Sequence, residues 1–361
     1  MLNESTLIEL LQRHGLVTHA EVLDQTLQIT RVDRRNENYR IRLVGARDLF
    51  IKQGYTAAST GSMAREAAVY ELLGAPYVAR HAGRYLIRYF GHDAASHVVM
   101  VEGVRDAEDV LAYHRRTGRL SVRLASQLGL ALGSLQRATR SPACRAIDEV
   151  RPWVFDLPRP GLELLREASA LNLKMIAILQ SNPTFERELT ALASEWRSDV
   201  LIHGDMKLEN CLTHPLVRRG ARGLKLVDWE HGGLGDACWD VACVLGSYLA
   251  LWVSSIPMPD PTAPQRHASS ARFPLTKIQR VLQTFVSSYA RASASEPHMR
   301  PEGLRKTVRM AAAHLIQVAY EHGACTNDLT APVLALIQMA LSILEQPERA
   351  ARDLLGLEAC V

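Results

Sequence analysis

The chain has 361 residues, of which 47% are hydrophobic and 22% are charged, and its formal net charge is +4. A chain of this length and apolar content can bury a large core, and we expect it to divide into two lobes. Lys and Arg exceed Asp and Glu by only 42 to 38, and no nucleic-acid-binding motif accompanies them. These observations argue against a nucleic-acid-binding protein.

Cysteine usage and apolar runs indicate where the protein works. The six cysteines are scattered without a C-x-x-C pair, as expected for reduced thiols in a cytoplasmic protein. The first twelve residues predict an amphipathic helix rather than a signal peptide. The apolar run Val241–Val253 has thirteen residues, so it predicts a buried helix and not a membrane span. We therefore expect a cytoplasmic protein without a membrane partner.

The first part of the chain predicts a sheet and a helix. Alternating apolar and polar residues indicate strands at 27–32, 39–44, 48–53, 86–90 and 97–102. Residues 63–73 have helical spacing, with Glu66 in the first turns, and Lys52 lies near the end of the third strand. A strand lysine and a later helix glutamate match the pair with which protein kinases hold the α- and β-phosphates of ATP. We predict that Lys52 and Glu66 bind a nucleotide; a strand-edge lysine and an exposed helix glutamate are the alternative.

The second half is predicted to be mainly helical. Helical spacing predicts helices at 121–137, 275–291, 301–321 and 329–346, with a short final helix or tail at 347–361. The four prolines between Ile256 and Pro264 cannot share a helix interior, so this segment predicts a loop. A β-hairpin is predicted at 211–227, and its basic turn, 214–225, indicates either a solvated loop or a docking patch for an acidic partner.

Two stretches of the chain carry the residue types of a phosphoryl-transfer site. Residues 203–210 read His-Gly-Asp-Met-Lys-Leu-Glu-Asn, and residues 227–230 read Val-Asp-Trp-Glu. Both follow short apolar strands, so their acidic residues are expected at strand ends. The spacing keeps the His, Asp and Asn of the protein-kinase loop H-R-D-L-x-x-x-N and the metal-binding Asp that follows it. A surface loop with solvated charges is the alternative, and the second Asp in register argues against it.

The chemistry of phosphoryl transfer assigns a role to each of these residues. An aspartate can accept the proton of an attacking hydroxyl, and amide and carboxylate oxygens are ligands that Mg²⁺ prefers. We therefore predict Asp205 as the catalytic base, and Asn210 and Asp228 as the metal ligands. Lys207 is predicted to offset the charge of the transferred phosphoryl group. The predicted cofactors are ATP or GTP, together with Mg²⁺.

The motifs resemble one enzyme family. H-G-D-x-K-x-x-N, V-D-W-E and the later G-x-G-D-x-x-W-D-V-A at 233–242 are similar to those of the aminoglycoside phosphotransferase and choline kinase group of kinase-like enzymes. The resemblance implies an α+β, bilobal, protein-kinase-like fold with ATP between the lobes. Its N-lobe, an antiparallel sheet plus a helix, would span residues 1–102. Its C-lobe, mainly α-helical with a small β-hairpin, would span residues 103–361.

The resemblance also implies roles for further residues. Asp240 and His203 would support the catalytic loop. Asn38 lies at the position of the loop that covers the nucleotide phosphates in related enzymes, and the turn before it contains no glycine. Val101 and Gly103 would belong to the hinge that offers backbone groups to adenine.

The acceptor is predicted less directly. The net charge of +4 argues against a polycationic aminoglycoside, and the 6% aromatic content argues against a quaternary-ammonium cage. The segment from V-D-W-E to Pro257 resembles kinases of lanthipeptide-type pathways, in which Ser or Thr of a ribosomally made peptide is phosphorylated and a separate lyase is a partner. A small-molecule kinase acting on an antibiotic, sugar or amino alcohol is the alternative. A pseudokinase-like scaffold is a further alternative, and the presence of all the predicted site residues argues against it.

Overall fold

The computed structural model describes residues 3–24, 27–33, 37–43, 48–140, 144, 146–214, 223–257, 269–294, 300–323 and 329–357. The chain divides into two compact units, Met1–Asp109 with Asn210–Gly233, and Val110–Glu209 with Leu234–Val361. Most of the predicted proline-rich loop and the middle of the predicted basic turn lie outside the described residues.

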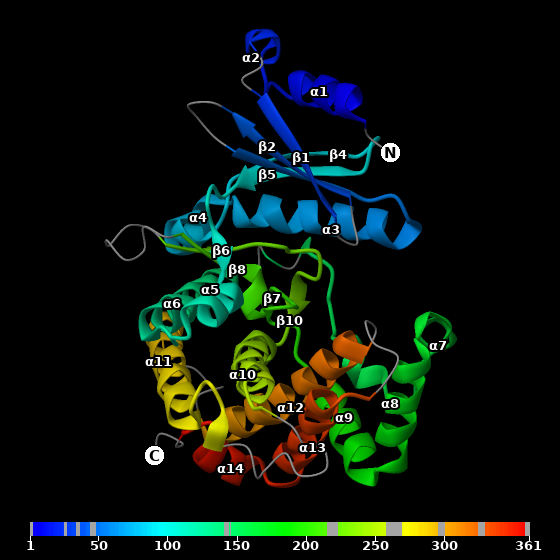
Figure 1. The fold of residues 1–361 in the computed structure, drawn as a ribbon, viewed down its shortest axis with the longest axis vertical. Coiled ribbons are helices and arrows are strands. Elements are labelled where there is room, and N and C mark those ends of the chain that lie inside the picture. Colours follow the sequence, from blue (N-terminus) through cyan, green and yellow to red (C-terminus); the bar gives the residue numbers. More distant parts are fainter. Residues whose placement is uncertain are drawn as a thin grey trace. The chain divides into compact units, whose positions relative to one another are not determined.

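The first unit is built on a five-stranded antiparallel sheet with the strand order β1-β2-β3-β5-β4 (Figure 1). Its strands are β1 (Leu27–Asp33), β2 (Glu37–Leu43), β3 (Asp48–Gln53), β4 (Tyr89–Asp93) and β5 (Val98–Gly103). All five predicted strands are present. β4 begins three residues later than predicted, after the 3₁₀ turn Gly83–Tyr85 and an isolated bridge from Leu86 to Leu226. β3, which carries Lys52, is the central strand.

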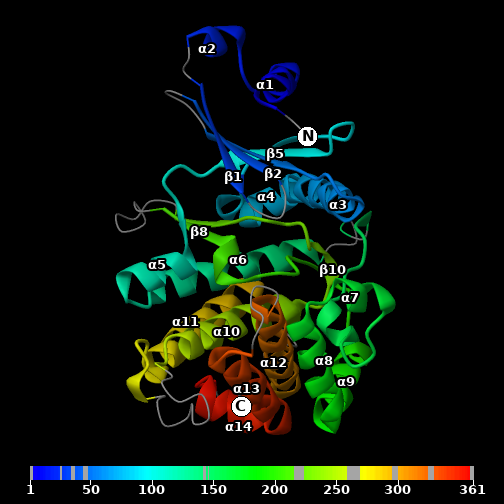
Figure 2. The same cartoon turned by 45° about the vertical axis from the view of Figure 1, so that its right-hand side comes forward.

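Helices cover both faces of this sheet. Helix α1 (Glu4–Arg13) buries Leu7, Leu10 and Leu11 in a core with Ile41 and Met100 of the strands. Figure 2 shows α1 and α3 (Ala57–Leu73) on opposite sides of the sheet. The short helices α2 (His19–Leu23) and α4 (Pro76–Ala82) complete this part of the unit.

Helix α3 begins earlier than the sequence pattern predicts. The side chain of Thr56 accepts a hydrogen bond from the backbone N–H of Ser59, and the two residues form a capping box. This cap extends the helix through the Gly- and Ser-rich segment 57–62, which resembles a bend in the sequence. Glu66 therefore lies in the interior of α3 and not in its first turns.

The small hairpin is grouped with the sheet rather than with the helices. β6 (Glu108–Asp109) pairs with β8 (Cys211–Thr213), which pairs with β9 (Leu224–Leu226). Lys225 of β9 also donates a hydrogen bond of 2.6 Å to the carbonyl oxygen of Leu86. Because of these bonds, residues 103–109 and 210–233 belong to the first unit, whereas a single boundary after residue 102 assigns them to the second.

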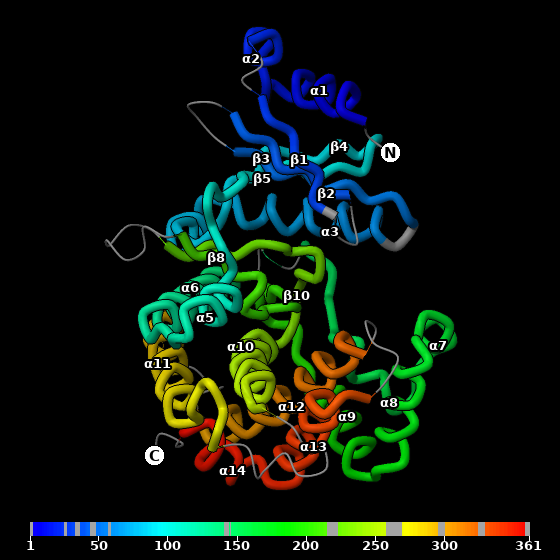
Figure 3. The backbone as a smooth tube through the Cα atoms, in the orientation of Figure 1, coloured from blue at the N-terminus to red at the C-terminus, as the bar shows by residue number. Residues whose placement is uncertain are grey.

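The second unit is mainly helical, and the tube in Figure 3 traces its helices along the chain. Its helices are α5 (Val110–Thr117), α6 (Val122–Thr139), α7 (Leu162–Glu167), α8 (Ala170–Ser181), α9 (Pro183–Ser194), α10 (Ala237–Ser254), α11 (Leu275–Ser293), α12 (Pro301–Gly323), α13 (Ala331–Glu345) and α14 (Pro347–Arg349). The strands β7 (Val200–Ile202) and β10 (Gly233–Gly235) pair next to the catalytic-loop segment. The long helices predicted from periodicity are present, and the α+β class is confirmed.

Helix α10 is the core of the second unit. Asp236 caps it through a hydrogen bond from the backbone N–H of Cys238. The helix has 18 residues, five more than the apolar run, and among the described residues it is the one helix long and apolar enough to cross a membrane. The buried helix predicted from the apolar run is therefore present, and it is longer than that run. However, 83% of this helix is buried against the other helices, as in the core of a globular domain.

Two glycines of α6 allow this helix to pack closely against α11. A Cβ atom on Gly129 would lie 2.3 Å from the carbonyl oxygen of Phe285. One on Gly133 would lie 2.6 Å from the carbonyl oxygen of Tyr289. Both distances are too short for any side chain, so the two helix backbones are in direct contact at this crossing.

Candidate active site

Lys52 lies on the central strand of the sheet, and its ammonium group contacts two carboxylates of the same unit. Its Nζ donates hydrogen bonds to Oε1 of Glu66, at 2.7 Å, and to Oδ1 of Asp228, at 2.5 Å. The Glu66 side chain is fully buried, and its Oε1 also accepts a hydrogen bond of 3.2 Å from the backbone N–H of Trp229. Lys52 therefore connects β3 with α3 and with the distant segment that follows β9.

Burial and charge act in opposite directions on this group of side chains. Burial alone would lower the pKa of Lys52, but the carboxylates of Asp228 and Glu66 raise that pKa well above its usual value. Burial raises the pKa of Glu66, and the charge of Lys52 opposes the rise. The lysine therefore keeps its charge at neutral pH, which is what binding of phosphate oxygens requires.

Asn210 and Asp228 are brought together by the β8–β9 hairpin. The backbone N–H of Val227, the residue before Asp228, donates a hydrogen bond of 3.0 Å to the carbonyl oxygen of Asn210. Asp228 has a φ of 73°, in the left-handed region where a non-glycine residue is uncommon and often functional. Asn210 is buried, and the Asp228 side chain is 30% exposed. An amide oxygen and a partly exposed carboxylate are suitable magnesium ligands.

The surroundings of these two residues limit the kind of metal site. Among the described residues, no group of three or more His, Cys, Asp or Glu side chains could hold a metal ion. A kinase-type Mg²⁺ needs only one or two side chains, because phosphates and water complete its coordination. The residues therefore fit a metal that binds together with a nucleotide.

The other residues predicted to bind the nucleotide lie on strands beside Lys52. Asn38 is opposite Lys52 in the pairing of β2 with β3, and its buried Oδ1 accepts no hydrogen bond from the described residues. Val101 and Gly103 are on β5, where Gly103 pairs with Asp48. A Cβ on Gly103 would lie 3.0 Å from the Cβ of Asp48, so glycine permits the close approach of these strands.

Two residues of α10 hold the backbone of the catalytic-loop segment, residues 203–210. The fully buried carboxylate of Asp240 accepts hydrogen bonds from the backbone N–H of His203, at 2.7 Å, and of Gly204, at 3.0 Å. The indole N–H of Trp239 donates to the carbonyl oxygen of Gly204 at 2.8 Å. Burial raises the pKa of Asp240 to about 7, although the two N–H groups lower it. This arrangement holds the backbone of the two residues that precede Asp205.

Asp205 and Lys207 form an ion pair in the second unit. The Lys207 Nζ lies 2.8 Å from Oδ2 of Asp205 and 3.5 Å from Oε2 of Glu321 on α12. Asp205 is 7% exposed, and the Lys207 side chain is 26% exposed. Burial would lower the pKa of Lys207, but the charges of Asp205 and Glu321 raise it above its usual value.

Glu321 was not among the predicted site residues. It lies near the end of α12, far along the chain from the catalytic-loop segment, and its sequence surroundings contain no recognisable motif. Only the tertiary contact with Lys207 identifies it.

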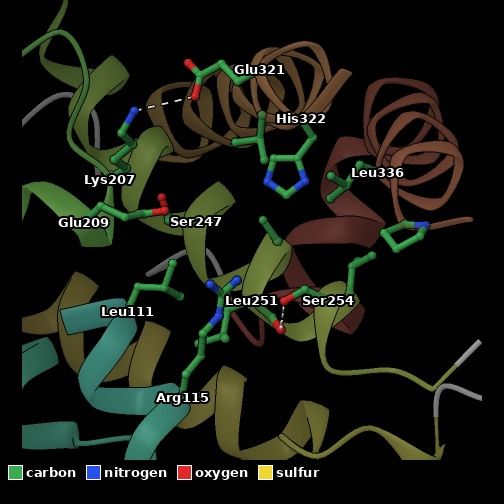
Figure 4. Close-up of a pocket in the computed structure, with 14 residues that line it drawn as sticks. Leu111, Arg115, Lys207, Glu209, Ser247, Leu251, Ser254, Glu321, His322 and Leu336 are labelled. Carbon is green, nitrogen blue, oxygen red and sulfur yellow. Dashed lines mark hydrogen bonds and ion pairs between the residues drawn. The ribbon is translucent and has the colours of Figure 1, made fainter. Parts of the chain in front are cut away.

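A pocket lies beside Lys207 in the second unit (Figure 4). Its walls come from α5, α10, α12 and α13, with the catalytic-loop segment at one end. The lining residues include Arg115, Ser247, Leu251, Glu321, His322 and Leu336. The pocket is therefore partly apolar, and one of its lining residues is Lys207, the ion-pair partner of Asp205.

Comparisons with known proteins agree with this geometry. The profile of the phosphotransferase enzyme family matches residues 26–267 of this chain. A search of curated proteins finds no significant match.

Solved structures of kinases share the fold. Choline kinase LicA from Streptococcus pneumoniae is similar with a TM-score of 0.51 and 14% identity, over 92% of this chain and 99% of that chain. Macrolide 2'-phosphotransferase MphH from Brachybacterium faecium is similar with a TM-score of 0.50 and 16% identity, over 95% and 98% of the two chains. Amicoumacin kinase hAmiN, in complex with AMP-PNP, Ca²⁺ and Ami, has a TM-score of 0.50 and 12% identity, over 94% and 96%. The fold is therefore kinase-like, as predicted.

Proposed function

Because this chain belongs to the phosphotransferase enzyme family, we propose that it transfers the γ-phosphate of ATP or GTP to an alcohol hydroxyl in a Mg²⁺-dependent reaction. One observation carries this proposal: a single lysine contacts both the α3 glutamate and the aspartate that follows β9. This constellation is the one with which kinases hold phosphates and metal together.

The first unit would bind the nucleotide. Lys52 would contact the α- and β-phosphates, with Glu66 fixing its position. Asp228 and Asn210 would hold Mg²⁺, which neutralises the phosphate charge when it is bound. Asn38, Val101 and Gly103 belong to the same proposed nucleotide site. The AMP-PNP and Ca²⁺ complex of amicoumacin kinase supports a nucleotide and a divalent metal as ligands of this fold.

The second unit would supply the base. As the acceptor oxygen bonds to the γ-phosphorus, the bond from that phosphorus to the bridging oxygen breaks and ADP leaves with its electron pair. Asp205 takes the proton of the hydroxyl, and Lys207 lies next to it to offset the charge of the transferred group. Asp240 positions the loop through the bonds to His203 and Gly204, without contacting the reactants.

Two classes of acceptor follow from different observations. The motif resemblance favours Ser or Thr of a ribosomally made peptide, with a lyase as a partner enzyme. The names of the structural neighbours favour a small-molecule alcohol, since choline and macrolides are small molecules.

Calorimetric titration with ATP and with GTP, each with and without Mg²⁺, tests the nucleotide site. We expect binding that depends on Mg²⁺ and that is lost when Asn210 and Asp228 are both replaced by Ala. The matched control is the double variant in which Asn182 and Asp156, which lie outside the site, are replaced by Ala. Circular dichroism checks that all variants are folded. A folded wild-type protein that binds neither nucleotide would contradict the proposal and favour the scaffold interpretation.

A further inference from the structure

The pocket beside Lys207 differs in charge from one end to the other. At the catalytic end, Lys207 is already matched by two carboxylates, Asp205 at 2.8 Å and Glu321 at 3.5 Å. Glu321 is further occupied, since its Oε1 accepts a hydrogen bond of 3.0 Å from Gln317. This end therefore has no surplus of positive charge.

Arg115 and His322 occupy the other part of the pocket. Figure 4 shows the side chains of both residues pointing into the pocket from opposite walls, Arg115 from α5 and His322 from α12. Arg115 is an exposed residue, and within the part of the chain that the structure describes it has neither a carboxylate partner nor a side-chain hydrogen bond. A guanidinium group that is aimed into a pocket and has no carboxylate partner of its own is suited to bind an anionic group of a ligand.

The floor of the pocket adds an apolar surface and one polar group. Leu251, Val253 and Leu336 are all buried there. Ser247 is 7% exposed, and its hydroxyl has no hydrogen-bond partner among the described residues. A buried hydroxyl without a partner is costly, and a ligand oxygen in the pocket would satisfy it.

The same lining argues against two other ligand classes. A quaternary ammonium group needs aromatic faces, and the described lining contains no Phe, Tyr or Trp. A polycation needs an acidic surplus, but the acids of the lining, Glu209 and Glu321, are matched in number by Arg115 and Lys207.

We propose that this pocket selects an acceptor alcohol that carries a carboxylate on an apolar body, with Arg115 binding the carboxylate and Ser247 a further oxygen. The proposal rests on the phosphotransferase function and names the acceptor of that same site. Two sources have this chemistry: a free hydroxy acid, and a Ser or Thr with a carboxylate nearby in a peptide.

The test uses the full chain with ATP, Mg²⁺ and matched acceptors, with phosphorylated products identified by mass spectrometry. One arm contains aliphatic hydroxy acids, their amides and the corresponding amino alcohols. A second arm contains Ser and Thr peptides in which the neighbouring residue is Asp or Asn. We expect product from the carboxylate members, and the arm in which it forms identifies the source.

Arg115→Gln then tests the residue. For the carboxylate acceptors we expect KM to rise roughly tenfold to a hundredfold, because a charge-assisted hydrogen bond is lost. The value of kcat should change little. KM for ATP should stay the same. The matched control is Arg116→Gln, the next residue of α5, whose guanidinium lies 5.8 Å from the centre of the Tyr113 ring and does not line the pocket.

Three results would overturn the proposal: a preference for the amides or amino alcohols, unchanged kinetics of Arg115→Gln, or a higher KM for ATP in that variant. A protein that binds ATP with Mg²⁺ but phosphorylates no carboxylate acceptor would overturn this proposal alone. Absence of Mg²⁺-dependent ATP binding would instead overturn the proposed function.

Discussion

Each unit of this protein places a lysine between two carboxylates, but the two groups differ in burial. In the first unit, Lys52 and Glu66 have side-chain exposures of 10% and 0%. In the second unit, Lys207 and Glu321 have exposures of 26% and 39%. The two groups therefore share a charge pattern, and each has one buried and one more exposed carboxylate, but Lys52 and its buried partner Glu66 are less exposed than Lys207 and Glu321.

This difference in side-chain exposure predicts different contributions of the two groups to folding stability and to catalysis. A buried carboxylate that loses its cation becomes an uncompensated charge in a medium of low polarity. An exposed carboxylate is solvated by water instead, and the net value of its ion pair is small. We therefore expect the Lys52 group to contribute to folding as well as to function, and the Lys207 group to contribute mainly to function. The following experiments test this comparison in order of decreasing effect.

Replacing Asp205 by Asn removes the proposed base with almost no change in shape. We expect the rate of phosphoryl transfer to fall on the order of a hundredfold to ten-thousandfold, because the amide cannot accept the hydroxyl proton. Nucleotide affinity should change little. Steady-state kinetics and calorimetry measure the two quantities, with the remote Asp156→Asn as the control. Near-normal turnover of Asp205→Asn would exclude it as the base.

Replacing Lys52 by Met leaves the buried Glu66 without its cation. We expect a loss of roughly 3–5 kcal/mol in the free energy of unfolding, together with weaker nucleotide binding. The carboxyl group can relieve the loss by binding a proton, so the destabilisation should be smaller at pH 5.5 than at pH 8. Urea unfolding at both pH values measures it.

A second substitution checks the cause of that loss. Adding Glu66→Gln to Lys52→Met should recover part of the stability, because the uncompensated charge is then absent. A double variant that is as unstable as the sum of the single variants would show that the two side chains are not coupled.

The second unit also contains a buried ionisable residue, His314, whose charged form is disfavoured by burial. Burial lowers the pKa of His314 to about 4, and its Nδ1 has no partner among the described residues. A lowered histidine pKa means that the unfolded chain binds the proton first. Stability is therefore lost as the pH falls from about 6.5 towards 4.

The contribution of His314 can be measured by comparison with a variant. Between pH 7.5 and pH 5 we expect the wild type to lose about 2 kcal/mol more stability than His314→Leu does. Urea unfolding at the two pH values measures this difference, and the exposed His81→Leu serves as control. An equal loss in wild type and His314→Leu would show that the buried imidazole does not titrate in this range.

Replacing Lys207 by Met should have the smallest effect on stability. Lys207 and Glu321 are both partly exposed, but Asp205 is 7% exposed and loses its cation, so we expect the free energy of unfolding to fall by about 1–2 kcal/mol, less than for Lys52→Met. The rate of transfer should fall nevertheless. A stability loss as large as that of Lys52→Met would mean that exposure does not distinguish the two groups.

Features that are local in the sequence could be predicted, and those that depend on tertiary contacts could not. The strand-end positions of Asp205 and Asp228 and the long helices follow from periodicity and motif spacing. The partner of Lys207 could not be found, because Glu321 reaches it only through the packing of α12. The predicted start of α3 is too late, because the capping box of Thr56 and Ser59 lies within a segment that resembles a loop. Similarly, the hairpin is assigned to the first unit by tertiary contacts, which are the pairing of β6 with β8 and the hydrogen bond from Lys225 to Leu86.

The crossing of α6 and α11 has a consequence for how this sequence can vary. Any substitution of glycine by another amino acid introduces a Cβ, and at Gly129 and Gly133 a Cβ would overlap a carbonyl oxygen of α11. No rotamer can relieve that overlap, since the obstruction is backbone on both sides. Substitution at either position therefore requires a rigid-body shift of a whole helix, so both should be among the least tolerant sites in a library of random variants.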